Sequence, residues 1–122
     1  MFKVDVTTKK ITMHRGDTGT VRFRFPGLDA VSADNIKAVF TMRTKHGAIV
    51  KQGIYEPDGI SVPVGFMNND TGNLDPGSYS YDIRIVGNAT YDESGKIDDG
   101  DLIYTPPGAP FEIELLDTVG II

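Results

Sequence analysis

A turn-rich stretch that leads into a strict alternation constrains the fold of this chain most strongly. Residues 70–85 read DTGNLDPGSYSYDIRI, and the first half is dense in Asp, Asn, Pro and Gly, the residues that favour tight turns. Large residues then alternate with small or charged ones at Tyr79, Tyr81, Ile83 and Ile85. A period of two is typical of a β-strand with one buried and one solvated face. The stretch therefore predicts a strand that begins directly after a sharp turn.

The same stretch has the pattern of a tyrosine corner made by Pro76, Gly77, Tyr79 and Tyr81. In such a corner, a Tyr at the start of a strand sends its hydroxyl back to the turn backbone and fixes the crossing between two sheets. Tyr79 would be the corner residue, and Tyr81 would lie where antibody domains carry their second Cys. The alternative is an ordinary strand after a Pro-Gly turn.

Short alternating runs recur along the whole chain, separated by Gly, Pro, Asn and Asp signals. The expected strands cover 2–6, 9–13, 20–25, 36–44, 48–54, 60–66, 78–86, 102–104 and 111–115. Phe2, Val4 and Val6 should share one face of their strand, opposite Lys3 and Asp5. Because Pro63 lies inside the run 60–66, that run is expected to be an edge strand or to contain a bulge. Residues 87–90 are expected to end the strand before them. A helical turn is expected near residues 32–35, and another within 68–77, capped by Asp70 or Thr71.

About eight or nine short strands without a sustained helical period predict an all-β fold. We expect residues 1–122 to form one domain, an immunoglobulin-like antiparallel β-sandwich, with a small β-barrel as the alternative. A chain of 122 residues buries enough surface to fold without a disulfide, and it contains no Cys.

The charge balance and the hydropathy pattern limit the classes of partner that we expect. A formal net charge of −5 argues against a nucleic-acid-binding surface, because such surfaces are rich in Lys and Arg. No apolar run is long enough for a signal peptide or a membrane span. We therefore expect a protein made in the cytoplasm without a removable address, with neither membrane nor nucleic acid as a partner.

The sequence offers no catalytic residue and no cofactor-binding motif. Its only histidines, His14 and His46, fall in expected turns, where a solvated His is the common case. No glycine-rich loop has a phosphate-binding pattern. An enzyme is therefore not predicted.

The acidic run 92–101 raises the question of a metal. Calcium favours several carboxylates from one loop, and Asp98, Asp99 and Asp101 are the candidates. The spacing matches no EF-hand, and Lys96 interrupts the run. A solvated hairpin tip is the preferred interpretation, so no metal site is predicted.

Cationic side chains could gather on one sheet face and meet an acidic partner. The residues concerned are Arg15, Arg22, Arg24, Lys37, Arg43, Lys45 and Arg84. The preferred interpretation is a solvated outer face with cross-strand ion pairs to residues such as Asp82. The edges of an open sandwich, each a template for another strand, and the apolar tail 119–122 are further candidates for contacts with neighbours.

Several stretches resemble small structural proteins of tailed bacteriophages. They are KITMHRGDTGTVRFRF (residues 10–25), NNDTGNLDPGSYSYDIRI (68–85) and PFEIELLDTVG (110–120). The chain is similar to the amino-terminal immunoglobulin-like domain of upper baseplate and tail proteins. That resemblance implies a non-enzymatic virion component, placed in the tail or baseplate, which acts by assembly with other virion proteins or with copies of itself.

Two rival interpretations follow from other residues. Arg15, Gly16 and Asp17 spell an integrin-ligand tripeptide, which we reject because Gly16 and Asp17 are expected to make a turn. A host-surface or carbohydrate-binding module is the functional alternative, with Tyr55, Tyr91 and Tyr104 as exposed aromatics. The absence of Trp, which commonly stacks on sugars, counts against it.

Overall fold

The computed structural model describes residues 2–117 and is mostly β. The strands are β1 (Lys3–Val4), β2 (Ile11–His14), β3 (Gly19–Arg24), β4 (Lys37–Thr44), β5 (Ile49–Tyr55), β6 (Ser61–Phe66), β7 (Gly77–Tyr91), β8 (Ile97–Tyr104) and β9 (Phe111–Leu116). Two short helical segments, η1 (Leu28–Ala30) and α1 (Asn68–Thr71), lie in the connections. The apolar tail 119–122 lies outside the described residues.

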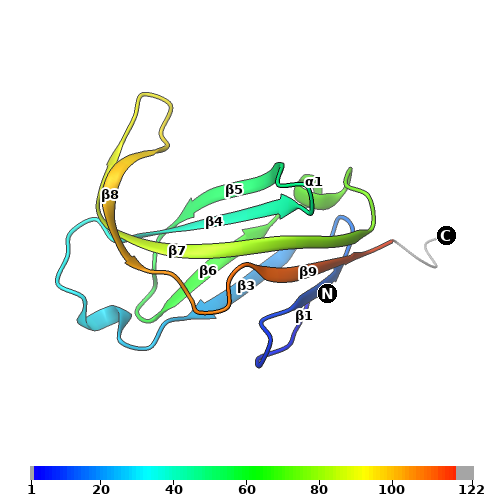
Figure 1. The fold of residues 1–122 in the computed structure, drawn as a ribbon, viewed down its shortest axis with the longest axis horizontal. Helices are drawn as coiled ribbons and strands as arrows, with labels where there is room; N and C mark the ends of the chain where they lie inside the picture. Colours follow the sequence, from blue (N-terminus) through cyan, green and yellow to red (C-terminus); the bar gives the residue numbers. More distant parts are fainter. Residues whose placement is uncertain (1, 118–122) are drawn as a thin grey trace.

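The strands form two sheets that face each other across one core (Figure 1). The larger sheet has the order β1-β2-β9-β7-β4-β5, and β8 also pairs with β7. The smaller sheet consists of β3 and β6. The all-β prediction is confirmed, and the barrel alternative is wrong, because the larger sheet is open from β1 to β5.

Strand β7 organises the larger sheet. Its first part, residues 77–81, pairs with β9, and its second part, residues 85–91, pairs with β8 along the same edge. Its other edge pairs with β4 over residues 79–86. The stretch 106–110, with three prolines, separates β8 from β9 and lets the two strands share that edge in tandem.

The core follows the alternation that the sequence predicts. Phe40 on β4, Ile83 on β7 and Ile113 on β9 are almost fully buried on the inner face of the larger sheet. Val62 and Val64 on β6 oppose them from the smaller sheet. Every second side chain of these strands faces inward, so burial of apolar surface fixes the register.

The expectation of a purely antiparallel sandwich is wrong at one pair. Strands β2 and β9 run parallel, with Ile11 opposite Ile113 and Met13 opposite Leu115. Almost the whole chain lies between these strands, so the pair does not depend on a short hairpin turn and parallel pairing is allowed. The larger sheet is therefore mixed.

Residues 87–90 were expected from the sequence to end the central strand, but in the structure β7 continues through them and bends there. The β7–β8 register shifts here, and Asn88 has a φ of 52°. Its amide donates to the carbonyl oxygen of Asp34 at 2.6 Å, which ties the bend to the loop before β4. Asn88 allows the strand to bulge here, because Asn adopts a positive φ more readily than most residues.

Three further local expectations differ from the structure. The helical turn expected at residues 32–35 lies earlier, at η1. The turn expected near Asp70 is present as α1, but Met67 is its N-cap, and Asp70 accepts a 2.7 Å hydrogen bond from the Met67 amide. The strand expected over residues 2–6 is shorter, since β1 covers only Lys3–Val4, and its apolar side is largely open, with Val4 41% and Val6 79% exposed.

Candidate functional site

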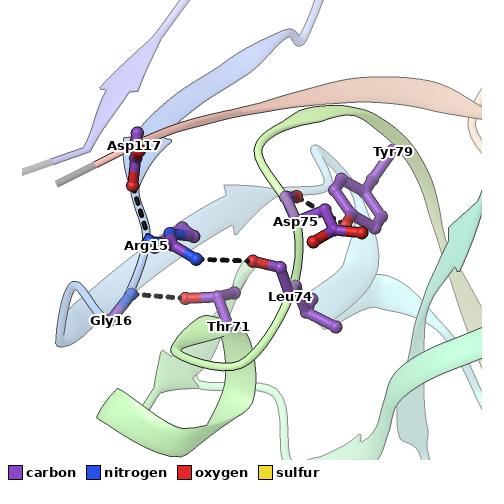
Figure 2. Close-up of polar contacts among 7 residues, drawn as sticks. All are labelled: Arg15, Gly16, Thr71, Leu74, Asp75, Tyr79 and Asp117. Carbon is purple, nitrogen blue, oxygen red and sulfur yellow. Dashed lines mark hydrogen bonds and ion pairs between the residues drawn. The ribbon is translucent and has the colours of Figure 1, made fainter.

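The predicted tyrosine corner carries the hydrogen bond that defines such a motif. The Tyr79 hydroxyl donates to the carbonyl oxygen of Asp75 at 2.7 Å (Figure 2). Pro76 and Gly77 lie between the two residues, and Gly77 takes a φ of 142° at the start of β7. Partial burial raises the pKa of the Tyr79 hydroxyl above its usual value.

Tyr81 lies in the core between the two sheets. Its ring stacks on Phe40 with 5.5 Å between centroids and also contacts Phe23 and Phe111. Its hydroxyl donates to the carbonyl oxygen of Lys9, which ties β7 to the turn before β2. Burial raises the pKa of Tyr81. Both tyrosines therefore serve the fold.

A polar clamp joins the three stretches on which the resemblance to phage proteins rests (Figure 2). Arg15 donates from Nη1 to the carbonyl oxygen of Leu74 at 3.3 Å, and from Nη2 to Asp117 at 2.6 Å. The amide of Gly16 donates to the hydroxyl of Thr71, a fully buried side chain, at 2.9 Å. These contacts connect the β2–β3 loop, the α1–β7 loop and the end of β9.

The clamp also explains the Arg-Gly-Asp tripeptide. The arginine is engaged in the clamp, and Asp17 accepts a 2.9 Å hydrogen bond from the amide of His14. Gly16 has a φ of 78°, which a glycine adopts without strain. The tripeptide is a structural turn whose charged side chains bind within the domain.

The cationic side chains are divided between the two sheets. Arg43 and Arg84 lie on the larger sheet and share Asp82, at 4.0 and 3.7 Å. Lys37 pairs with Glu56 on the same side of the molecule. Arg22 and Arg24 belong to the smaller sheet. The structure therefore does not gather all of these residues on one basic face.

The acidic residues of the 92–101 run do not converge. Asp98, Asp99 and Asp101 lie along β8, where side chains alternate between faces. Asp101 accepts a hydrogen bond from the side-chain amide of Asn88 at 2.9 Å. Within residues 2–117, no three His, Asp or Glu side chains are grouped closely enough to hold a metal ion. The hairpin tip itself is 92–96, where Asp92 accepts from the amides of Ser94 and Lys96.

The two histidines lie at the surface of the described part of the chain. His14 lies 3.9 Å from Asp17 at the surface, and His46 is exposed in the β4–β5 turn. The contact of His46 with a hydroxyl is made by its backbone amide, which donates to Oγ1 of Thr44 at 3.2 Å, and within that part neither imidazole ring is hydrogen-bonded to a Ser or Thr hydroxyl. Within residues 2–117, a Ser or Thr nucleophile with a histidine base is therefore not assembled.

The tyrosines proposed for sugar stacking are separated. Tyr55 and Tyr104 end the same cross-strand row, with Ala38 and Ile85 between them. Tyr91 lies further along β7, opposite Ile97. Tyr104 packs edge-on against Phe25, at 5.6 Å between ring centroids. The three rings do not form one stacking platform.

The hairpin formed by the second half of β7 and by β8 projects from the rest of the larger sheet as an arm (Figure 1). The sequence indicated a hairpin tip in the run 92–101, but not the two strands that extend from it. We define the arm as residues 88–100. It curves over the outer face of β4 and β5, where Ile54 and Val39 face Ile97 across an open hollow of about 470 Å³. The signal in the sequence was hidden, because Gly87 and Asn88 read as a break.

Comparison with protein-family models, with curated proteins and with solved structures finds no match to this chain. Within residues 2–117, no helix is long and apolar enough to cross a membrane. We therefore infer a function from three features: the arm, the open sheet edges and the clamp.

Proposed function

We propose that this protein is a non-enzymatic structural component of a bacteriophage or prophage particle, located in the tail or baseplate. It acts as an immunoglobulin-like β-sandwich that assembles with other virion proteins or with copies of itself. The resemblance of residues 10–25, 68–85 and 110–120 to phage structural proteins motivates the location. The convergence of these stretches on the clamp supports their role as framework, because their residues hold the domain together.

The projecting arm is the observation that carries the assembly mechanism. A two-stranded ribbon in water is marginally stable when no other surface packs against it. Tyr91 is 45% exposed on the arm, and the tip residues 91–96 are exposed as well. A neighbouring subunit that packs against the arm would bury these groups and fix its direction.

A deletion that follows the register of the hairpin tests this proposal. Gly87 pairs with Asp101, so removal of residues 89–99 leaves Asn88 and Gly100 as a two-residue turn between them. Asn-Gly is the preferred sequence for such a turn, and Asn88 already has a positive φ. The shortened protein should therefore keep the two sheets and the core.

The measurement is incorporation into particles. Phage particles made with the full-length protein should contain it after density-gradient purification, whereas the shortened protein should stay in the soluble fraction. A charge control outside the arm, Lys45→Gln at an exposed position of the β4–β5 turn, should leave incorporation unchanged. Incorporation of the shortened protein at the full-length level would contradict assembly through the arm.

A further inference from the structure

Strand β3 has one edge that no described strand occupies. β3 pairs with β6 alone, with Val21 opposite Val64 and Phe23 opposite Val62. The amide of Phe25 donates to the carbonyl oxygen of Ile60 at 2.7 Å, so the backbone groups of this residue point toward β6. Since successive residues of a strand point to opposite sides, the backbone groups of Thr20, Arg22 and Arg24 point to the free edge.

The outer edge of β6 is less suited to strand addition. Pro63 lies opposite Arg22, at a position whose backbone groups point away from β3. A proline has no N–H to donate there, which is a common protection of sheet edges. The free edge of β3 is therefore the better template of the smaller sheet.

An apolar groove runs beside this edge. Its volume is about 400 Å³, and Tyr81, Ile83 and Phe111 of the larger sheet line it. Val4 and Val6 line it as well, which explains why these two apolar side chains are exposed. The larger sheet has more strands than the smaller one, so part of its inner face is left without a covering strand.

The charged residues that border the groove are all cationic. Lys9, Arg22 and Arg24 line it, and no carboxylate does, although the whole chain has a net charge of −5. Arg22 contacts Asp58 at 3.6 Å, with both side chains more than half exposed, so water screens this pair strongly. The groove is thus a locally basic surface on an acidic protein.

We propose that the free edge of β3 and the adjoining groove bind an extended segment of a partner protein with alternating apolar and acidic side chains. The segment adds to β3 as a third strand of the smaller sheet. Its residues opposite Val21 and Phe23 face inward and place apolar side chains in the groove. Its residues opposite Arg22 and Arg24 face outward, where carboxylates lie beside the two guanidinium groups. This site is separate from the arm, which the deletion of residues 89–99 removes.

The probe is a capped nine-residue peptide of alternating Val and Glu with a fluorophore, titrated against the full chain. We expect Arg24→Glu to weaken binding by about tenfold or more, since it places a carboxylate beside those of the peptide. Arg84→Glu is the matched control, because Arg84 lies on the larger sheet, and it should change binding by less than about twofold. A peptide with Lys in place of Glu should bind at least about tenfold more weakly than the Val-Glu peptide. A peptide whose alternate amides are N-methylated should lose at least as much affinity.

Amide hydrogen exchange locates the contact. The amides of Thr20, Arg22 and Arg24 should exchange fast in the free protein and at least about tenfold more slowly with the Val-Glu peptide. Those of Val21 and Phe23 should be slow in both states. Failure of this peptide to bind at millimolar concentration, equal binding of the Lys peptide, or unchanged exchange at the three edge amides would overturn the proposal. Protection of the same amides by raised protein concentration alone would replace the partner with a second copy of this chain.

Discussion

The Tyr79 hydroxyl donates a 2.7 Å hydrogen bond to the carbonyl oxygen of Asp75, four residues earlier in the chain. This contact closes the turn that directs β7 into the sheet. The adjacent loop carries Leu74, whose carbonyl oxygen accepts from Arg15. This turn therefore connects the central strand to Arg15, which in turn contacts Asp117 at the end of β9.

Loss of this hydrogen bond should be measurable. Tyr79→Phe should lower the free energy of unfolding by about 1 kcal/mol, the usual net contribution of one protein hydrogen bond. Denaturant unfolding measures the change. Tyr91→Phe is the matched control on the exposed arm and should change the stability by less than about 0.5 kcal/mol. Equal effects of the two substitutions would show that the corner contact contributes nothing specific.

The buried Tyr81 should make the fold sensitive to alkali. Burial raises the pKa of this hydroxyl above the ordinary value of 10.0, so the folded state holds its proton after the unfolded state has lost it. The contribution of this hydroxyl to the free energy of unfolding is present in full below pH 10 and is lost as the pH rises above 10. Urea unfolding at pH 8 and about pH 10.5 should show a smaller loss for Tyr81→Phe than for wild type. Identical losses would contradict the assignment.

Arg15 should contribute more to stability than its ion-pair partner. Arg15→Ala removes the contacts to both Leu74 and Asp117, whereas Asp117→Ala removes one of them. We expect a loss of about 1–2 kcal/mol for the first variant and about 0.5 kcal/mol for the second, which loses a largely exposed pair. The thermal unfolding temperatures rank the two variants, and the reverse order would refute the clamp.

Calcium should not stabilise the protein. A specific site saturated at a hundred times its dissociation constant would add about 2.7 kcal/mol to the free energy of unfolding. Because Asp98, Asp99 and Asp101 do not converge, a scan with calcium and one with a chelator should give the same unfolding temperature. A clear rise with calcium that disappears in Asp99→Asn would establish a site.

The local alternation predicted the inward residues well. Phe40, Val64 and Ile83 are buried as their positions within alternating runs require. The turn composition around Asp75 likewise led to the contact made by Tyr79. In these segments, neighbouring residues carry the information, because strand period and turn chemistry are local properties.

The parts of the fold that the sequence did not predict depend on pairings between residues that are far apart in the chain. Ile11 meets Ile113 in a parallel pair that no local signal encodes. Gly87 and Asn88 signal a departure from ideal strand geometry, but only the contact with Asp34 makes that departure a bulge. Val6 follows a buried pattern, yet it lines an open groove because the smaller sheet lacks a strand beside β3.

The most direct test of the assembly proposal is quantitative mass spectrometry of gradient-purified particles from cells that encode this chain. The account predicts a constant ratio of this protein to the other tail proteins across all particle fractions, and loss of the protein from tailless particles. A protein confined to the soluble lysate, with none in purified particles, would contradict a structural role in the virion.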